Sequence, residues 1–234
     1  MTRGGFTAES VSVGSFSDAA RGAPGTVVVI DVFRAFTTAA VALAQGAGRV
    51  VMVDDLQQAL DLRARTPGSL CIGERGGLKP PGFDFGNSPA EFRGADIAGR
   101  TLIQTTSNGT RGILAARGAA RIYAGALVTA EATVRAIAAG GHDPVRIVAM
   151  GQKDSRRTEE DEICALYLRS RLLGRHPDRA ATCRLIETMS TRSDTRRLSK
   201  ADLASCLDFD SVPFAVRVTV EDGLHVAQPE FPPA

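Results

Sequence analysis

The feature that most constrains the fold is an alternation of short β-branched runs with longer alanine-rich segments. Residues 26–32 (TVVVIDV) are apolar up to an acid, which is typical of a strand buried on both faces. Further strands are predicted at 49–53, 69–73, 100–106, 120–126 and 145–150, and helices at 35–48, 55–65, 109–118, 129–141 and 158–174. Strands separated by helices of this length predict a parallel or mixed sheet that is covered on both faces.

The pattern changes beyond residue 175, where more helix is followed by residues 214–228 (FAVRVTVEDGLHVAQ). This stretch predicts a hairpin that turns at Asp222-Gly223. We therefore expect one α/β domain over residues 1–234 with a C-terminal helix-plus-hairpin elaboration; a sub-lobe over 175–234 is the alternative. Helix starts are predicted at Thr129, as an N-cap, and at Thr158 with Asp161, in capping-box spacing.

Composition limits the partners. The chain has 44% hydrophobic and 23% charged residues and a net charge of +2, so neither nucleic acid nor a membrane surface is expected. The four cysteines are scattered without a CxxC pair, which argues against zinc or a redox dithiol; Cys71 and Cys164 are expected in the core. Residues 1–15 lack the apolar stretch of a signal peptide, and we predict a cytoplasmic protein.

The segment 73–89 (GERGGLKPPGFDFGNSP) is too rich in Gly and Pro for a regular helix or central strand. Its end is explained by helix-start chemistry, with Ser88 as N-cap, Pro89 in the first turn and Glu91 completing a capping box. Glu74 and Asp84 have no such explanation, and salt bridges to Arg75 or Lys79 are the structural alternative. The only histidines are His142, His176 and His225, none near Ser88 in the sequence, so a Ser-His-Asp triad is not expected.

Polar residues also follow the strand predicted at 26–32. Asp31 ends the apolar run, and Arg34 and Thr37 come next. Ligands of open α/β sheets bind beyond the carboxyl ends of strands, where helix N-termini offer free N–H groups to anions. Asp31 could therefore ligate a cation or attack phosphorus, and Arg34 could bind phosphate or sulfonate; an N-cap acid and a surface arginine are the alternative.

Two more polar clusters follow later strands. Residues 104–110 (QTTSNGT) offer hydroxyl and backbone N–H donors, and residues 158–162 (TEEDE) bring four consecutive carboxylates to a helix start. A capped turn and an acidic first helical turn are their structural alternatives. Together with Asp31 and 73–89, they predict carboxylates, anion donors and arginines at one edge of the sheet, as metal-assisted chemistry on a phosphate ester requires.

These motifs resemble those of the 2-phosphosulfolactate phosphatases. The shared stretches, over nearly the whole chain, are VVIDVFRAFTTA, GERGG…GFDFGNSP, TTSNGT, EEDEICA and CLDFDSVPFAV. The resemblance implies a three-layer α/β/α fold and a Mg²⁺-dependent phosphatase that converts 2-phospho-3-sulfolactate into sulfolactate and phosphate, on a route to coenzyme M. It implies a small phosphorylated, sulfonated substrate as partner and leaves a homo-oligomer open.

The resemblance also implies roles for the residues at the motif positions. The expected catalytic residues are Asp31, Glu74 and Asp84, with Asp31 as metal ligand or nucleophile. The expected metal ligands are Asp31, Asp84, Glu160 and Asp161. The expected substrate-binding residues are Arg34, Thr37, Arg75, Asn87, Ser88, Thr105, Thr106, Asn108, Gly109 and Thr110. Arg34 and Arg75 would neutralise the phosphoryl and sulfonate charges, and the helix N-termini after Asp31 and at residues 108–110 would hold phosphate oxygens.

The chain departs from the family pattern at Phe33 and Phe36, which we expect to reshape one wall of the pocket, and at Ser107, which keeps the hydroxyl of a threonine. Two alternatives therefore stay open: a hydrolase of another small phosphorylated hydroxy acid, and a non-catalytic protein that binds a phosphorylated or sulfonated metabolite. The density of carboxylates disfavours the second. A haloacid-dehalogenase-like phosphatase is excluded, because that family needs a second Asp where this chain has Phe33.

Overall fold

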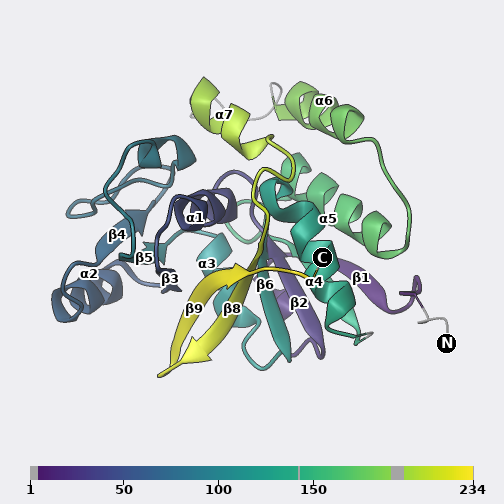
Figure 1. Ribbon diagram of the computed structural model, residues 1–234, viewed down its shortest axis with the longest axis horizontal. Helices are drawn as coiled ribbons and strands as arrows, with labels where there is room; N and C mark the ends of the chain where they lie inside the picture. Colours follow the sequence, from purple (N-terminus) through teal and green to yellow (C-terminus); the bar gives the residue numbers. More distant parts are fainter. Residues whose placement is uncertain (1–4, 142, 191–197, 234) are drawn as a thin grey trace.

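The run predicted to be buried on both faces forms strand β2 (Thr26–Ile30) in the computed structural model, which describes residues 5–141, 143–190 and 198–233. Val27 and Val29 pack into one hydrophobic cluster, and Val28 and Ile30 pack into another. Side chains of a strand alternate between the faces of a sheet, so both faces need a cover. Helices supply it on either side, and the fold is a three-layer α/β/α fold (Figure 1).

The elements follow the predicted order. The strands are β1 (Val11–Ser15), β2, β3 (Arg49–Met52), β4 (Leu70–Gly73), β5 (Thr101–Thr105), β6 (Arg121–Gly125), β7 (Val145–Ala149), β8 (Ala215–Glu221) and β9 (Leu224–Glu230). The helices are α1 (Ala35–Ala44), α2 (Leu56–Arg65), α3 (Gly109–Ala115), α4 (Ala130–Ala139), α5 (Glu159–Leu172), α6 (Arg179–Ser190) and α7 (Lys200–Cys206), with 3-10 turns η1 (Ser17–Ala20), η2 (Pro89–Phe92) and η3 (Leu127–Thr129). Strand β1 was not predicted. His142 and residues 1–4 lie outside the described residues.

The predicted hairpin forms and turns at Asp222-Gly223, but it lies inside the sheet. The strand order is β1-β7-β2-β6-β8-β9-β3-β5-β4, and Figure 1 shows the yellow hairpin next to β6. The contacts β6–β8, β8–β9 and β9–β3 are all antiparallel. The parallel set β1, β7, β2 and β6 therefore runs opposite to the parallel set β3, β5 and β4.

This reversal changes where the strand ends lie. The expectation that they share one edge is wrong, because the two sets point in opposite directions. Adjacent strands rotate by about 20–25°, so the five steps from β2 to β5 accumulate roughly 100–125° and the two sets cross. Loops from both sets, after β2 and β7 and after β4 and β5, line the same cavity.

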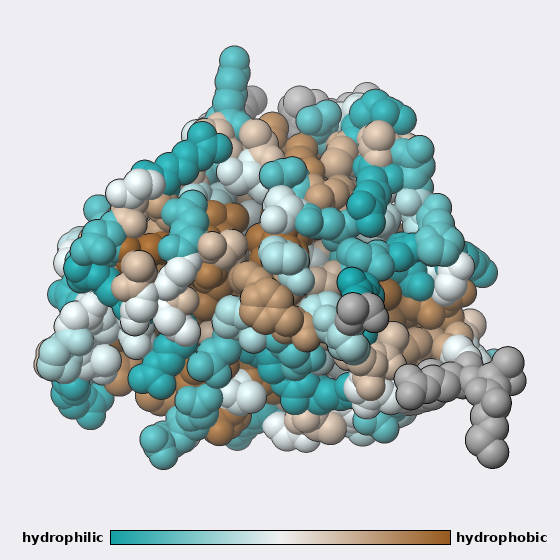
Figure 2. Space-filling model, viewed as in Figure 1, coloured by the Kyte–Doolittle hydropathy of each residue, from teal (hydrophilic) through white to brown (hydrophobic). Residues whose placement is uncertain are grey.

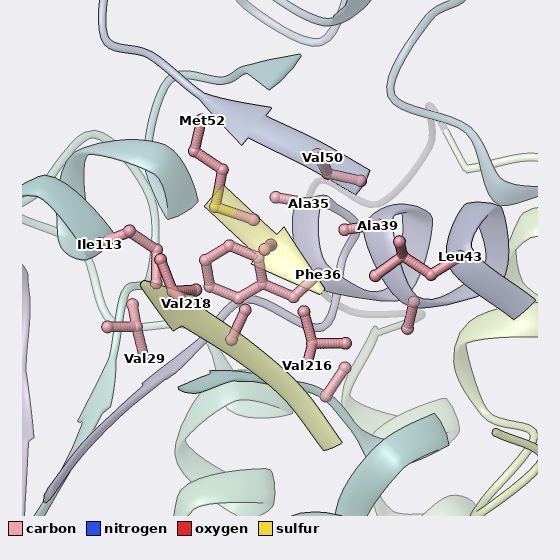
Figure 3. Close-up of a cluster of buried hydrophobic side chains, with 14 of the residues drawn as sticks. Val29, Ala35, Phe36, Ala39, Leu43, Val50, Met52, Ile113, Val216 and Val218 are labelled. Carbon is pink, nitrogen blue, oxygen red and sulfur yellow. The ribbon is translucent and has the colours of Figure 1, made fainter. Parts of the chain in front are cut away.

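Phe36, one of the two aromatic departures, is a core residue. Its ring is fully buried among Val29, Met52, Ile113 and Val218, between α1 and the sheet (Figure 3). The expectation that it shapes a pocket wall is wrong, because the first turn of α1 directs it into the sheet. Thr129 and Thr158 occupy the N-cap positions of α4 and α5, as predicted, but neither caps its helix with its side chain.

The surface is mixed. Figure 2 shows hydrophilic side chains over most of the viewed face, with small apolar areas between them. The exposed large hydrophobic residues come from distant parts of the chain and are Leu78, Leu166, Leu185, Val220 and Phe231. Within the described ranges, no helix has both the length and the apolar character needed to span a membrane.

Candidate active site

A cavity of about 820 Å³ lies where the loops after β2, β4, β5 and β7 meet, a size that suits a small ligand. Its lining residues among those described are Asp31, Phe33, Arg34, Glu74, Gly76, Gly77, Asn87, Asn108, Gly151, Gln152, Lys153, Ser155, Arg156, Arg157, Thr158, Glu159, Glu160 and Leu198. Six of the predicted site residues thus come together, and they are Asp31, Arg34, Glu74, Asn87, Asn108 and Glu160.

Asp31 lies at the floor of this cavity, directly after β2. Its carboxylate is 6% exposed and accepts hydrogen bonds from the backbone N–H groups of Ala35, at 3.0 Å, and of Gly109. Burial raises the pKa of Asp31 to about 6, and the nearby charge of Glu74 acts in the same direction. A Cβ on Gly109 would lie 2.8 Å from Asp31 Oδ2, so only glycine lets the start of α3 approach this acid.

Glu160 and Asp161, in the first turn of α5, have different surroundings. Glu160 lines the cavity, and burial together with the charge of Asp31 raises its pKa to about 7. The Asp161 carboxylate instead accepts from the N–H groups of Val32 (2.8 Å) and Gly151 (2.9 Å) and does not line the cavity. Burial, with the charges of Glu160 and Asp31, raises the pKa of Asp161 well above its ordinary value. Asp161 therefore joins the ends of β2 and β7 to α5, which also explains why it forms no capping box.

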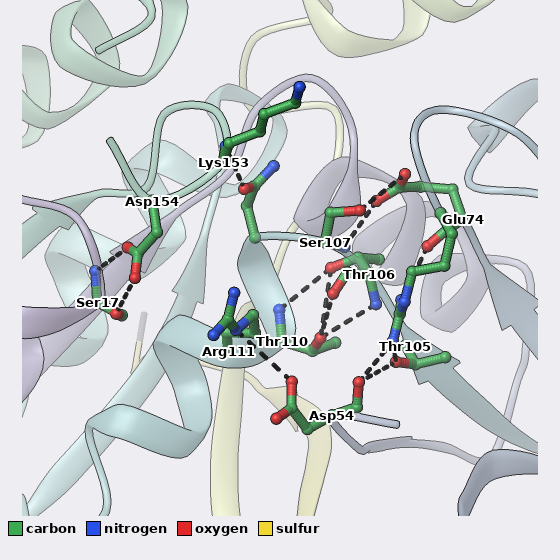
Figure 4. Close-up of polar contacts among 12 residues, drawn as sticks. Ser17, Asp54, Glu74, Thr105, Thr106, Ser107, Thr110, Arg111, Lys153 and Asp154 are labelled. Carbon is green, nitrogen blue, oxygen red and sulfur yellow. Dashed lines mark hydrogen bonds and ion pairs between the residues drawn. The ribbon is translucent and has the colours of Figure 1, made fainter. Parts of the chain in front are cut away.

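Glu74 joins the loops after β4 and β5 (Figure 4). One carboxylate oxygen accepts from Ser107 N–H (2.7 Å), and the other from Gly77 N–H (2.7 Å) and Ser107 Oγ (3.2 Å). Glu74 lines the cavity but is only 8% exposed. Its carboxylate fixes the positions of two loops whose backbone N–H groups have no partner in the sheet.

The N-termini of α1 and α3 were expected to hold phosphate oxygens. This expectation is wrong for the backbone N–H groups of Ala35, Gly109 and Thr110, which already have acceptors within the chain. Asp31 takes the N–H groups of Ala35 and Gly109. Thr106 Oγ1 accepts from Thr110 N–H (3.2 Å), and Thr110 Oγ1 accepts from Thr106 N–H (3.0 Å) (Figure 4). Carboxylates and hydroxyls of the chain itself thus occupy the donors that sequence reasoning assigned to a ligand.

Arg34 is held in the cavity by Asp202, a residue of α7 that sequence reasoning missed. Arg34 Nη1 donates to Asp202 Oδ2 at 2.6 Å, and Asp202 Oδ1 accepts from Ser88 Oγ (2.6 Å) and Ala90 N–H (3.2 Å). Burial opposes ionisation of Asp202, but the hydrogen bonds from Ser88 and Ala90 and the charge of Arg34 together lower its pKa. The peptide bond between Phe33 and Arg34 is cis.

The capping box predicted at residues 88–91 is therefore wrong. Ser88 stands at the N-cap of η2 with Pro89 in the first turn, as predicted, but its hydroxyl bonds to Asp202 instead of capping. Glu91 accepts from Gly86 N–H at 2.7 Å. Because Asp202 lies 114 residues beyond Ser88, no local pattern could reveal this contact.

Asp84 is not brought to the cavity. Its carboxylate accepts from Cys71 N–H (2.8 Å) and from Arg63 (3.1 Å), and so ties the loop to β4 and α2. The structural alternative for Asp84 was a salt bridge to Arg75 or Lys79. A salt bridge does form, but its partner is Arg63. Asp84 is therefore left out of the functions proposed below.

Three other expected substrate contacts lie outside the cavity lining. The Arg75 guanidinium donates to the carbonyls of Glu74 and Asp54 and to Thr105 Oγ1. Thr105 Oγ1 also donates to Asp54 O (3.0 Å), and Thr37 Oγ1 donates to Val32 O (2.9 Å). These polar atoms stabilise the loops that frame the cavity.

Sequence reasoning missed the basic side of the cavity, which the segment Gly151–Arg157 provides. Lys153, Arg156 and Arg157 line it from the loop between β7 and α5. A signal was present, because QKDSRR follows the strand predicted at 145–150 after a single glycine, the kind of position where the other candidates were sought. Phe33, the second aromatic departure, does line the cavity, as expected.

The residues of the cavity fit a hydrated cation, although no group of three or more His, Cys, Asp or Glu side chains within the described ranges could hold a metal. Mg²⁺ keeps several waters and is often held by one or two carboxylates together with substrate phosphate. Asp31 and Glu160 both line the cavity, and the charge of Asp31 raises the pKa of Glu160. Asn87 Oδ1, also in the lining residues, is buried without a hydrogen-bond partner.

Fold and site together define an α/β/α protein with a polar cavity for a small charged ligand at its strand ends. Comparison with known proteins is more specific. The chain belongs to the 2-phosphosulpholactate phosphatase family, whose sequence profile matches residues 16–217.

Relatives in several organisms carry a similar name. A "Probable 2-phosphosulfolactate phosphatase" of Deinococcus radiodurans is 43% identical over 129 residues, which are 55% of this chain and 54% of that protein. Proteins with the same name in Thermoplasma volcanium (33% identical; 78% of this chain, 84% of that protein) and Gloeobacter violaceus (33% identical; 85% and 90%) match over longer stretches. The chain spans about half the length of the Deinococcus relative.

Proposed function

We propose that the protein is a Mg²⁺-dependent phosphatase that hydrolyses 2-phospho-3-sulfolactate to sulfolactate and phosphate. The observation that carries the proposal is the pair Asp31 and Glu160, two buried carboxylates with raised pKa values in one cavity that also presents four cationic side chains. Membership of the 2-phosphosulpholactate phosphatase family supports the choice of substrate.

Asp31 and Asn87 would hold the cation, with Glu160 beside them. Bound Mg²⁺ would neutralise charge on the phosphoryl group and lower the pKa of a water molecule. Asp31 already accepts two backbone N–H bonds, which stabilise the anion and weaken it as a nucleophile, so we favour a ligand role over a phospho-enzyme. Arg34, oriented by Asp202, would donate to a phosphoryl oxygen.

Glu160 would move the proton. Burial raises the pKa of this cavity-lining carboxyl, which suits an acid that protonates the leaving oxygen. Water adds to phosphorus and the bond from phosphorus to the ester oxygen breaks. The ester oxygen takes the proton from Glu160, the attacking water gives up one proton to solvent, and the Glu160 carboxylate regains one proton from solvent. The products are phosphate and the free hydroxy acid.

One observation favours a second substrate. Phe33, at which the chain departs from the motif pattern that it resembles, lines the cavity. The aromatic wall would suit another small phosphorylated hydroxy acid that is bound by the same groups.

Phosphate release from racemic 2-phosphosulfolactate, with Mg²⁺ and with Mg²⁺ plus chelator, tests the proposal. We expect turnover that the chelator abolishes and that added Mg²⁺ restores. A parallel panel of other phosphorylated hydroxy acids tests the second substrate. Turnover that is unchanged by the chelator would show that the mechanism needs no metal. A poor rate on phosphosulfolactate together with a fast rate on another panel member would identify that compound as the better substrate.

A further inference from the structure

The cationic side chains of the cavity are not equivalent. Arg34 is paired with Asp202, and Arg157 Nε lies 3.6 Å from Glu162 Oε1. Lys153 and Arg156 line the cavity as well, and neither makes an ion pair with any described residue. Among the described residues, the cationic side chains of the cavity that have no ion pair therefore lie on the segment Gly151–Arg157.

The one acid of this segment does not neutralise it. Asp154 turns to η1, where its carboxylate accepts from Ser17 N–H (2.7 Å) and Ser17 Oγ (2.5 Å) (Figure 4). Lys153 and Arg156 thus keep no acidic partner among the described residues, and they line the same cavity as the buried carboxylates of Asp31 and Glu160. A ligand that carries two separate negative groups suits this arrangement, with one group at the cation site and the other at the basic segment.

The segment is also held in place without a ligand. Gln152 and Arg156 exchange two backbone hydrogen bonds, N–H to O at 2.7 and 3.0 Å, which close a tight turn. Lys153 N–H donates to Asn108 Oδ1 at 2.8 Å, which joins the turn to the loop after β5. Lys153 and Asp154 have φ values of 54° and 52°, the left-handed region that residues other than glycine seldom adopt. Because the backbone of this turn is already ordered, ligand binding costs it little further conformational entropy.

We propose that Lys153 and Arg156 form the subsite for the non-transferred anionic group of the substrate, a sulfonate or carboxylate, and that Asp154 positions this subsite by its contacts with Ser17. The proposal rests on the proposed function for the place of the phosphoryl group. It assigns the second charge to the segment Gly151–Arg157, whereas the resemblance implied that Arg34 and Arg75 together neutralise the phosphoryl and sulfonate charges. The guanidinium of Arg75 is used within the loops.

Binding of sulfolactate, which carries both acidic groups but no phosphate, tests the subsite without catalysis. Titration calorimetry compares wild type with Lys153→Met, Arg156→Met and a matched control, Arg65→Met, on the last turn of α2 and outside the cavity. We expect each cavity variant to weaken binding by about tenfold, the loss of one charge-assisted contact, and the control to change nothing. Equal affinities in all four proteins would overturn the proposal.

Kinetics distinguishes this proposal from the proposed function. KM for phosphosulfolactate should rise about tenfold in Lys153→Met and Arg156→Met, whereas the loss of kcat/KM on phenyl phosphate, which lacks a second anionic group, should be clearly smaller. Equal losses on both substrates would overturn the subsite and leave the phosphatase intact. A wild-type protein that binds sulfolactate through Lys153 and Arg156 but hydrolyses no phosphate ester would keep the subsite and overturn the phosphatase.

Two further arms separate the sources of charge and the role of Asp154. 2-Phospholactate lacks the sulfonate, and phosphoisethionate lacks the carboxylate. If Lys153→Met leaves the KM of one of these substrates unchanged, that substrate lacks the group that Lys153 binds. An unchanged KM for both substrates would count against the subsite. Asp154→Ala removes a negative charge, which by charge alone should tighten sulfolactate binding. We expect weaker binding, because the turn loses its contact with Ser17, and tighter binding would refute the positioning role.

Discussion

The loops after β2 and β7 and the loops after β4 and β5 are built from the same kinds of residue, yet they contribute differently to the cavity. In the first pair, Asp31 and Glu160 line the cavity with raised pKa values, and Lys153 and Arg156 have no acidic partner among the described residues. In the second pair, Glu74 bonds to backbone N–H groups of both loops.

The difference follows from what the backbone leaves unpaired. The glycine-rich path after β4 and the turn after β5 carry many N–H groups without a partner in the sheet, and buried donors need acceptors. Glu74, Asp84 and Thr106 supply them. The polar side chains of the second pair of loops are therefore largely used by the local backbone.

The largest expected effect is that of Asp31→Asn. If Asp31 holds the cation, kcat should fall by roughly 10³-fold or more, while Asn keeps an acceptor for Ala35 N–H. Steady-state kinetics with saturating Mg²⁺ measures the loss, and sulfolactate titration checks that the cavity is intact. Retained turnover would place the chemistry elsewhere, and tighter ligand binding with no wild-type turnover would indicate a metabolite sensor.

The comparison predicts a different result for Glu74→Gln. The amide can accept at one oxygen only, so either Ser107 N–H or Gly77 N–H loses its acceptor. We expect the free energy of unfolding to fall by about 1–3 kcal/mol, with a lower melting temperature and a smaller loss of kcat than in Asp31→Asn. Melting temperature and kcat, measured on the same preparation, test this prediction. An unchanged melting temperature with abolished turnover would make Glu74 a catalytic residue.

The pH dependence of stability tests the first pair of loops directly. The pKa values of Asp31 and Glu160 are raised to about 6 and 7, so the folded protein binds more protons than the unfolded chain between about pH 4 and 7. The metal-free protein should therefore lose stability as pH rises through this window and be more stable at pH 5 than at pH 8. Melting temperatures in chelator measure this slope, which should be smaller with Mg²⁺; a slope of the opposite sign would contradict the burial of these charges.

The smallest expected effect is that of Asp84→Asn. Its ion pair with Arg63 is about one-third exposed, and Asn retains an acceptor for Cys71 N–H. We expect a loss of about 0–1 kcal/mol in the free energy of unfolding and kcat within roughly twofold of wild type. A 100-fold loss of turnover or of Mg²⁺ affinity would restore Asp84 to the metal site that the resemblance implied.

Much of the fold could be predicted because its signals are local. The unbroken apolar run of β2, the alanine-rich α1 and the Asp222-Gly223 turn depend on periodicity and backbone sterics within about ten residues. Strand β1 was missed because Val11–Ser15, with three small or hydroxyl residues among five, has no apolar run. The motifs also predicted which strand ends would meet, and six of their residues share the cavity.

What the sequence determined by itself is most of the elements, the family and the strand ends that carry polar residues. Only the tertiary structure decided which of those residues face a ligand. The C-terminal hairpin, placed within the sheet, reverses the second strand set. Asp202, 168 residues from Arg34 and 114 from Ser88, fixes both. Hydrophobic periodicity depends on neighbouring residues in the sequence, whereas the pairing of a buried donor with its acceptor depends on which segments pack together.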